Sequence, residues 1–316
     1  MSSSAPRITS TLLPLLLLLI SGSTAPSCAA GCDPADRAAL LRVKAQLGDP
    51  ARLSAWRASS PNCCAWDPAV VCGGAGGGRV TALALYSLPD VSARVPPALG
   101  DLAALEILQV DSVPGLSGPV PASFANLTRL RDLDVNGTSI SGPVPGALLA
   151  GAASLSTLVI ANSKLAGPIP ASLASLPNLR YLDLSGNLLT GAIPPGLLHG
   201  SFRFLLLSDN RLTGEIPADG GGEDVDTFDL SRNQLTGDPS PFLFGITRPA
   251  AKIDLSWNRL EFDMTGVRFP HHLRFLDLSH NRLCGAIPAG PPFDHLDADS
   301  FGGNTCLCGG PLGKCT

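Results

Sequence analysis

Aspartates that recur at one position of a repeating pattern are the first residues in this sequence that could do chemistry. They are Asp134, Asp183, Asp229, Asp254 and Asp277. Two carboxylates held at a fixed separation could serve as the acid and the nucleophile of a glycoside hydrolase. These aspartates recur once per repeat, however, which favours a scaffold position. They would either keep a surface soluble or form an acidic stripe that attracts a basic partner.

Other catalytic signatures are missing from the sequence. None of the five histidines belongs to an HExxH motif, and there is no GxSxG motif or phosphate-binding loop. The histidines are His199, His271, His272, His280 and His295. The glycine-rich segment 73–78 does not fit GxGxxG, because Arg79 occupies the last glycine position. We therefore predict a non-enzymatic protein with no catalytic residues, no cofactor and no metal site, in which His271 and His272 are exposed turn residues.

Apolar and aromatic side chains lie at neighbouring positions of the same pattern. Large apolar residues on a surface cost solubility, and they are the types that anchor protein interfaces. This combination predicts a binding surface for another protein. The residues expected to form it are Asp134, Val159, Tyr181, Asp183, Phe204, Leu206, Ser208, Thr227, Asp229, Lys252, Asp254 and Trp257.

A repeat of leucines and asparagines must position these side chains. Five segments of the LxLxxN type, with Phe228 and Ile253 as the first apolar residue in two of them, end at Asn187, Asn210, Asn233, Asn258 and Asn281, which are 23, 23, 25 and 23 residues apart. This spacing is typical of leucine-rich repeats. Earlier segments such as Leu83/Leu85 and Leu133/Val135 continue the register without the asparagine. We predict about nine repeats over residues 80–283.

Each repeat is too short to bury its own apolar face, so the leucines of successive repeats must stack into one core. The LxL segments alternate inward and outward as strands do, which predicts a parallel sheet along the inner curve. The asparagine amides are expected to satisfy backbone groups at the turn that leaves each strand. We predict an α/β solenoid, a right-handed curved superhelix with a concave parallel β-sheet and disulfide-bonded caps at both ends.

A second pattern follows the asparagines, as in Gly118–Pro121, Gly167–Pro170 and Gly285–Pro288. Glycine permits a turn and proline stops an ordinary helix. This LxGxIP form resembles the plant-specific class of leucine-rich repeats, whose convex side carries extra short strands and tight helical turns.

The N-terminal residues 1–30 have the pattern of a secretory signal peptide. A single positive charge at Arg7 precedes an apolar run from Leu12 to Ile20, and small residues such as Ala29 and Ala30 follow. The run is too short to span a membrane, and no later segment is long and apolar enough. Without the signal peptide the chain has 21 basic and 26 acidic residues, which makes nucleic acid an improbable partner. We expect a secreted monomer in the extracellular space or cell wall.

Eight of the nine cysteines remain after removal of the signal peptide. They are Cys32, Cys63, Cys64, Cys72, Cys284, Cys306, Cys308 and Cys315. They form two groups of four with none between, and no CxxC pair exists. An even number in a secreted chain favours disulfides over metal binding. We predict an N-terminal cap at 31–79 and a C-terminal cap at 284–316.

The N-terminal cap is expected to begin with a helix that covers the first repeat. Asp33 and Pro34 form a helix start, and Gly48 ends the apolar pattern. Adjacent Cys63 and Cys64 are poorly disposed to bond to each other, so each should find another partner. Trp56 and Trp66 are expected to pack beneath this helix.

The whole layout resembles the plant polygalacturonase-inhibiting proteins over essentially all of the mature chain. The resemblance is carried by the cysteine spacing at both ends, the repeats, and the stretches 229–238, 253–263 and 282–285. It implies the disulfides Cys32–Cys63, Cys64–Cys72, Cys284–Cys306 and Cys308–Cys315. It also implies that the partner is a fungal or insect endopolygalacturonase. Such inhibitors usually have about ten repeats, and this chain lacks one just before the C-terminal cap.

Two other functions fit the same sequence. One is a peptide or co-receptor binding module like the ectodomains of plant receptor kinases, with a role in developmental signalling. The other is a wall protein that binds pectin through basic residues such as Arg180, Arg203 and Lys252, although these are interleaved with acids. Two sequons, at Asn126 and Asn136, are candidate glycosylation sites. A glycan on Asn136 would crowd the early inner face and move the partner toward the later repeats.

Overall fold

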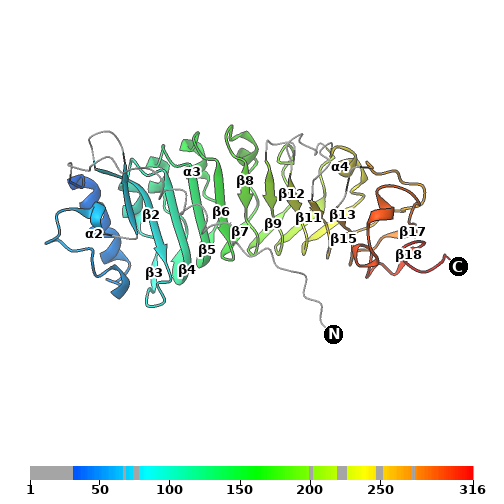
Figure 1. The fold of residues 1–316 in the computed structure, drawn as a ribbon, viewed down its shortest axis with the longest axis horizontal. Helices are drawn as coiled ribbons and strands as arrows, with labels where there is room; N and C mark the ends of the chain where they lie inside the picture. Colours follow the sequence, from blue (N-terminus) through cyan, green and yellow to red (C-terminus); the bar gives the residue numbers. More distant parts are fainter. Residues whose placement is uncertain are drawn as a thin grey trace.

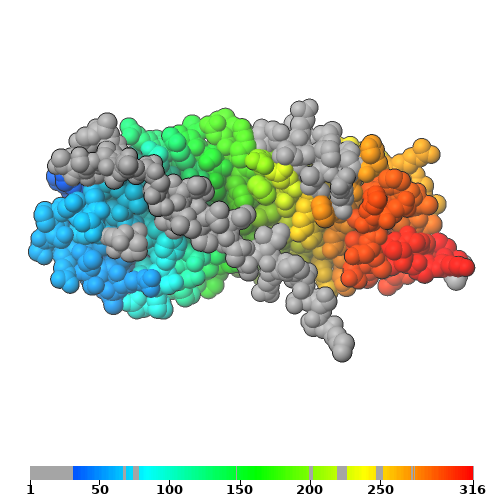
Figure 2. Space-filling view, viewed as in Figure 1, coloured from blue at the N-terminus to red at the C-terminus, as the bar shows by residue number. Residues whose placement is uncertain are grey.

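The computed structural model describes residues 31–66, 69–73, 78–198, 202–218, 226–246, 252–271, 273 and 275–315. The predicted signal peptide, His199 and His272 lie outside these ranges. The repeats stack along the longest axis of the molecule, with the helix α2 (Pro34–Gln46) at one end and the short strands β17 and β18 at the other (Figure 1). The space-filling view shows one continuous elongated body between these ends (Figure 2).

A parallel sheet built from one strand per repeat forms the concave face. Its strands follow the chain order, except that antiparallel β1 (Val70–Gly73) covers the first one. The strands are β2 (Arg79–Tyr86), β4 (Ile107–Gly118), β5 (Asp132–Gly142), β6 (Thr157–Ala161), β8 (Tyr181–Asp183), β10 (Phe204–Leu206), β12 (Thr227–Asp229), β14 (Lys252–Asp254) and β16 (Phe275–Asp277). The predicted solenoid with its concave parallel sheet is confirmed.

A second set of short strands follows the turns that leave the concave strands. These are β3 (Ala93–Arg94), β7 (Lys164–Gly167), β9 (Leu188–Gly191), β11 (Arg211–Glu215), β13 (Gln234–Gly237) and β15 (Arg259–Leu260). Short helical turns close the repeats on the other side: η4 (Pro97–Asp101), η5 (Ala122–Asn126), α3 (Gly146–Gly151), η6 (Ala171–Ser175) and α4 (Ser240–Phe244). The prolines of the LxGxIP pattern precede several of these turns, because proline is tolerated where a helix begins.

The leucine register is the one that the sequence predicts. Leu182, Leu205 and Leu207 are fully buried, whereas Tyr181 and Phe204 are half-buried on the opposite side of their strands. Strand pairing places equivalent residues of successive repeats side by side, as in Phe204 beside Tyr181. The core is therefore a stack of leucine layers that no repeat could complete alone.

A ladder of buried asparagine side chains links the repeats. The Nδ2 group of Asn233 donates to the carbonyl oxygens of Leu207, Leu230 and Ser231 at 3.0–3.2 Å, and its Oδ1 accepts from the Leu212 amide at 3.0 Å. Each amide thus joins two repeats by satisfying backbone groups that the turn would otherwise leave unpaired. The described ladder contains Asn187, Asn210, Asn233, Asn258, Asn281 and Asn304.

Asn304 shows that the repeat pattern extends into the C-terminal cap. It donates to the carbonyls of Leu278 and Phe301 and accepts from the Leu283 amide. Phe301, fully buried, takes the place of the second leucine. The backbone of this turn also accepts hydrogen bonds from the last concave repeat, since the Leu278 amide donates to the Ser300 carbonyl. The cap therefore packs on the last repeat through the same asparagine and backbone hydrogen bonds that join successive repeats.

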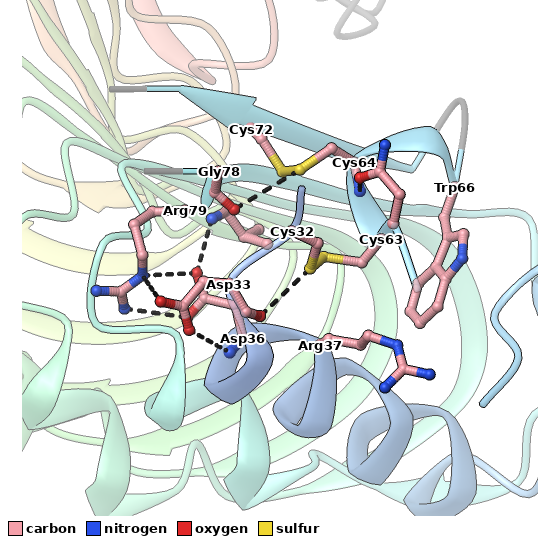
Figure 3. The surroundings of a disulfide bond; sticks show 12 residues. Cys32, Asp33, Asp36, Arg37, Cys63, Cys64, Trp66, Cys72, Gly78 and Arg79 are labelled. Carbon is pink, nitrogen blue, oxygen red and sulfur yellow. Dashed lines mark hydrogen bonds and ion pairs between the residues drawn. A yellow bond between two sulfur atoms is a disulfide. The ribbon is translucent and has the colours of Figure 1, made fainter. Parts of the chain in front are cut away.

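The N-terminal cap is joined to the first repeat by an ion pair between the buried Asp36 and the half-buried Arg79 (Figure 3). Asp33 caps α2 by accepting from the amides of Ala35 and Asp36. Asp36 is fully buried, accepts from Nε and Nη2 of Arg79 at 2.8 and 3.0 Å, and also accepts from the Val80 amide at 2.8 Å. These bonds join the helix to the first concave strand.

Disulfides close both ends of the described chain, with the partners that the family resemblance implies. Cys32 bonds to Cys63 and Cys64 to Cys72 in the N-terminal cap. In the C-terminal cap, β17 (Cys284–Ala286) pairs with β18 (Cys306–Cys308), and the bonds are Cys284–Cys306 and Cys308–Cys315. Trp56 and Trp66 are buried and stacked at a centroid distance of 5.6 Å, as expected.

Candidate functional site: the concave face

Outward side chains of the concave strands form three parallel rows. Strand pairing across the later repeats defines an entry row, a centre row and an exit row, named for their order along each strand. The entry row is Asp132, Thr157, Tyr181, Phe204, Thr227, Lys252 and Phe275. The centre row is Gln109, Asp134, Val159, Asp183, Leu206, Asp229, Asp254 and Asp277. The exit row is Asp111, Asn136, Ala161, Ser185, Ser208, Ser231, Ser256 and Ser279. All of the predicted binding residues except Trp257 lie in these rows.

Four centre-row aspartates accept a hydrogen bond from the backbone amide two residues further on, at the end of their own strand. Oδ1 of Asp183 accepts from the backbone amide and the hydroxyl of Ser185 at 2.9 and 2.6 Å. Asp229 and Asp254 make the same two bonds to the serine two residues further on, and Asp277 accepts from the amide of its serine. Burial raises the pKa of Asp183 and Asp254, while these serine bonds lower it. Much of the acidic stripe therefore has a structural role in addition to its charge.

Asp134 differs from the other centre-row aspartates. Asn136 occupies the position of the serine and donates to Asp111, so Asp134 makes no hydrogen bond or ion pair with any described residue. Only 6% of Asp134 is exposed. Burial, and then the charges of Asp111, Asp183 and Asp132, raise its pKa to about 6.

The expected free access of Asp134 and Val159 is wrong. Val159 is only 8% exposed, and both side chains are enclosed on the inner face. Asp134 lies between Gln109 and Val159 in the centre row, with one of them on each neighbouring strand. Tyr181 borders the same region, and burial together with the charges of Asp183 and Asp134 raises its pKa to about 12.

An aromatic pair dominates the entry row. The rings of Tyr181 and Phe204 lie 5.2 Å apart, and the Arg203 guanidinium lies 6.0 Å from the Phe204 centroid. Arg203 in turn donates to Asp226 at 2.7 Å. Leu206 is half-buried beside this pair, and the rings and leucine together offer an apolar anchor.

Phe275 ends the entry row and is 60% exposed. It pairs with Lys252 in the strand register, and Lys252 is also exposed. The predicted residues Ser208, Thr227 and Asp229 lie between this end and the aromatic pair and are half-buried. The later half of the face therefore exposes apolar, acidic and basic groups together.

Trp257 lies outside the three rows, on the turn that follows β14. Its ring stacks on His280 at a centroid distance of 3.8 Å, and the Arg232 guanidinium lies 5.1 Å from it. The sequence predicts an exposed tryptophan at this position. It does not predict that Trp257 lies on a turn apart from the row that contains Tyr181 and Phe204. The stacking of His280 on Trp257 is an additional finding, which no motif in the sequence predicts.

The two sequons have different surroundings. Asn136 lies in the exit row, where it donates to Asp111 at 2.8 Å, and it accepts from Asn162 on the neighbouring turn at 2.9 Å. Asn126 lies at the end of η5, away from the concave strands. A glycan on Asn126 would leave the binding face open, whereas one on Asn136 would stand on it. Glycosylation of either residue stays a prediction.

The asparagine ladder, the stacked leucines and the paired caps define a leucine-rich-repeat protein. Residues 33–72 match a family model described as a leucine rich repeat N-terminal domain, and residues 153–212 and 272–292 match leucine rich repeat models. No helix within the described part of the chain has both the length and the apolarity to cross a membrane.

Relatives match nearly the whole chain. Polygalacturonase inhibitor 1 of Oryza sativa subsp. japonica is 46% identical over 95% of this chain and 96% of its own, and the polygalacturonase inhibitor of Pyrus communis is 39% identical over 95% and 97%. A crystal structure of a plant ice-binding protein covers 91% of this chain and 99% of its own, with a TM-score of 0.78 and 34% identity. The chain belongs to the polygalacturonase inhibitor family.

Proposed function

We propose that this protein is a secreted plant defence protein that binds pathogen endopolygalacturonases on its concave face and thereby limits pectin degradation. The observation that carries the proposal is the 39–46% identity to polygalacturonase inhibitors over 95% of the chain. The protein would act by binding, without catalysis of its own, and it would work as a monomer.

The concave face offers two complementary contributions to such a complex. The carboxylates of the centre row would attract the basic rim of an enzyme cleft and speed its approach. The Tyr181–Phe204 pair and Leu206 would then hold the enzyme, because aromatic groups packed at the middle of an interface supply much of its binding energy. A bound solenoid would block entry of the pectin chain into the cleft.

The test measures release of reducing ends from polygalacturonate by a panel of fungal and insect endopolygalacturonases, with and without the purified protein. We expect inhibition of at least one enzyme. A double variant, Phe204→Ala with Leu206→Ala, should weaken that inhibition by roughly 10- to 100-fold, as expected for truncation of two anchoring residues.

Phe244→Ala is the matched control, because Phe244 is 52% exposed but lies on α4, away from the concave strands. It should leave inhibition unchanged. If the wild-type protein inhibits no enzyme but binds polygalacturonate, the pectin-binding alternative replaces the proposal. Equal potency of the double variant and the wild type would discard the Phe204 patch while leaving inhibition itself intact.

A further inference from the structure

The turns that leave the concave strands carry a second continuous surface, which we call the rim stack: Arg232, Trp257 and His280. They occupy the same position in three successive repeats, just before the ladder asparagines. Their backbones are joined, since the Arg232 amide donates to the Ser256 carbonyl and the Trp257 amide to the Ser279 carbonyl. The rim stack is therefore held by the solenoid and does not depend on a loose loop.

The backbone at this position is left-handed, with φ of 53° at Arg232, 55° at Trp257 and 53° at His280. Glycine and asparagine adopt this conformation most readily, and a bulky residue there is strained. The equivalent turn of the other repeats carries only small or short polar residues, namely Ser87, Ser112, Gly137, Asn162, Gly186, Asp209 and Gly303. The chain thus accepts strain at three neighbouring turns to place large side chains on the rim, and such outliers point to function.

The three side chains are ordered against one another. Trp257 and His280 are nearly parallel, with an interplanar angle of 17° and centroids 3.8 Å apart. His280 lies over Gly303, where a Cβ would come within 2.5 Å of its Nδ1. Arg232 covers Trp257 at 5.1 Å from the preceding repeat, opposite His280. Trp257 is nevertheless 47% exposed, so a rigid aromatic edge faces solvent. A side chain that is already ordered loses little entropy on binding.

The turn segments that carry the rim stack, together with the turn before them, are rich in arginine. The four turn segments 209–211, 232–234, 257–259 and 280–282 contain four arginines and one aspartate. Arg211, Arg232, Arg259 and Arg282 are all exposed. The single carboxylate, Asp209, lies 4.0 Å from Arg232, and both side chains are more than half exposed, so this pair is weak. These turn segments therefore carry more arginines than carboxylates, in contrast to the acidic centre row.

We propose that the rim stack is a second docking surface, which binds an acidic surface loop of the inhibited polygalacturonase through the exposed edge of Trp257 and the flanking arginines. This inference rests on the proposed function. It adds an acidic loop of the enzyme as a second contact, beside the basic rim of the enzyme cleft that would meet the acidic centre row. A loop carrying carboxylates beside an apolar group fits both features, because arginine pairs with carboxylates in two-bond geometry.

A uronate oligosaccharide is also anionic but fits this surface less well. A sugar ring usually packs on the face of an aromatic side chain, and both faces of Trp257 are covered, by Arg232 and by His280. The remaining edge suits a protein surface. The geometry therefore favours a protein loop over an oligosaccharide of the same charge.

The test compares the affinity of wild-type protein and Trp257→Gly for an endopolygalacturonase that the wild type inhibits, by surface plasmon resonance. Glycine is unstrained at this φ and occurs at the equivalent Gly186 and Gly303, so the variant should keep its fold, as checked by a thermal melt. We expect Kd to rise about 10- to 30-fold. Trp257→Asn, which introduces the residue type found at the equivalent Asn162, is the second variant and should behave in the same way.

Arg232→Gln should weaken binding less and reduce its dependence on salt, whereas Phe244→Ala should change neither. An unchanged Kd in the folded Trp257 variants would overturn the inference. The inference would also be overturned if the Trp257 variants lost affinity for trigalacturonate but bound the enzyme as the wild type does, because the rim stack would then be a glycan-binding site. If the wild type binds no polygalacturonase at all, the proposed function fails and this inference fails with it.

Discussion

The enclosed carboxyl group of Asp134 should make this protein less stable at neutral pH than it would be with an amide at the same place. Asp134 is 6% exposed, has no hydrogen-bond partner among the described residues, and has a pKa raised from 3.8 to about 6. Asparagine has nearly the same shape and carries no charge. Asp134→Asn should therefore remove the cost of burying an ionised carboxylate beside Asp111 and Asp183.

The size and the pH range of the effect follow from the pKa. The native protein holds the proton up to about pH 6, whereas the unfolded chain releases it near pH 4, so the native state binds more protons in this window. Stability then falls as pH rises from about 4 to about 6, and the full penalty applies above it. The shift corresponds to about 3 kcal/mol at most. Asp134→Asn should gain up to this amount at neutral pH and almost nothing near pH 4.

Urea unfolding followed by circular dichroism at about pH 7 and about pH 4 measures both values, provided that the slope with urea is the same for variant and wild type. Asp209→Asn is the control, because Asp209 is an exposed carboxylate whose replacement should change stability by no more than about 0.5 kcal/mol. An Asp134 variant that is no more stable at neutral pH, or equally stabilised at both pH values, would refute the reasoning.

Two further predictions concern the scaffold. Asn233→Ala should destabilise the protein by about 2–5 kcal/mol, because it leaves the buried Leu212 amide and the Leu207 carbonyl without partners. Urea unfolding measures this loss, with Gln234→Ala as the adjacent control. A loss of stability below about 1 kcal/mol would contradict the prediction. Asp36→Ala should cost about 1–3 kcal/mol because it leaves the Val80 amide without its partner and removes the two hydrogen bonds that the Arg79 guanidinium donates at the N-terminal cap. A thermal melt indistinguishable from wild type would show that the cap does not need this pair.

The repeat makes most of the architecture predictable. A fixed spacing of leucines and asparagines determines which side of each strand is buried, so the outward positions of Tyr181, Phe204 and Leu206 follow from counting residues. The disulfide partners follow from the family resemblance, since cysteine spacing alone allows other pairings.

Features that depend on neighbouring repeats are not predictable in the same way. Whether Asp134 and Val159 are accessible depends on side chains from adjacent strands, and the sequence shows only that they face the same side as the others. The Asp36–Arg79 pair joins residues 43 apart and has no local pattern. Trp257 is visible as an aromatic residue, but its stacking on His280 requires knowledge of how left-handed turns align along the solenoid.

The ladder asparagine in the C-terminal cap also determines how the sheet ends. A parallel sheet with a bare last strand would offer its unpaired amides and carbonyls to another molecule, and identical chains could then add end to end into a fibre. Leu278 and His280 instead donate to the carbonyls of Ser300 and Gly302, and Asn304 completes the final rung. At the opposite end, β1 covers β2. Within the described residues, the chain itself thus covers the first concave strand and takes up backbone donors at the end of the last one, which leaves fewer groups open to end-to-end pairing.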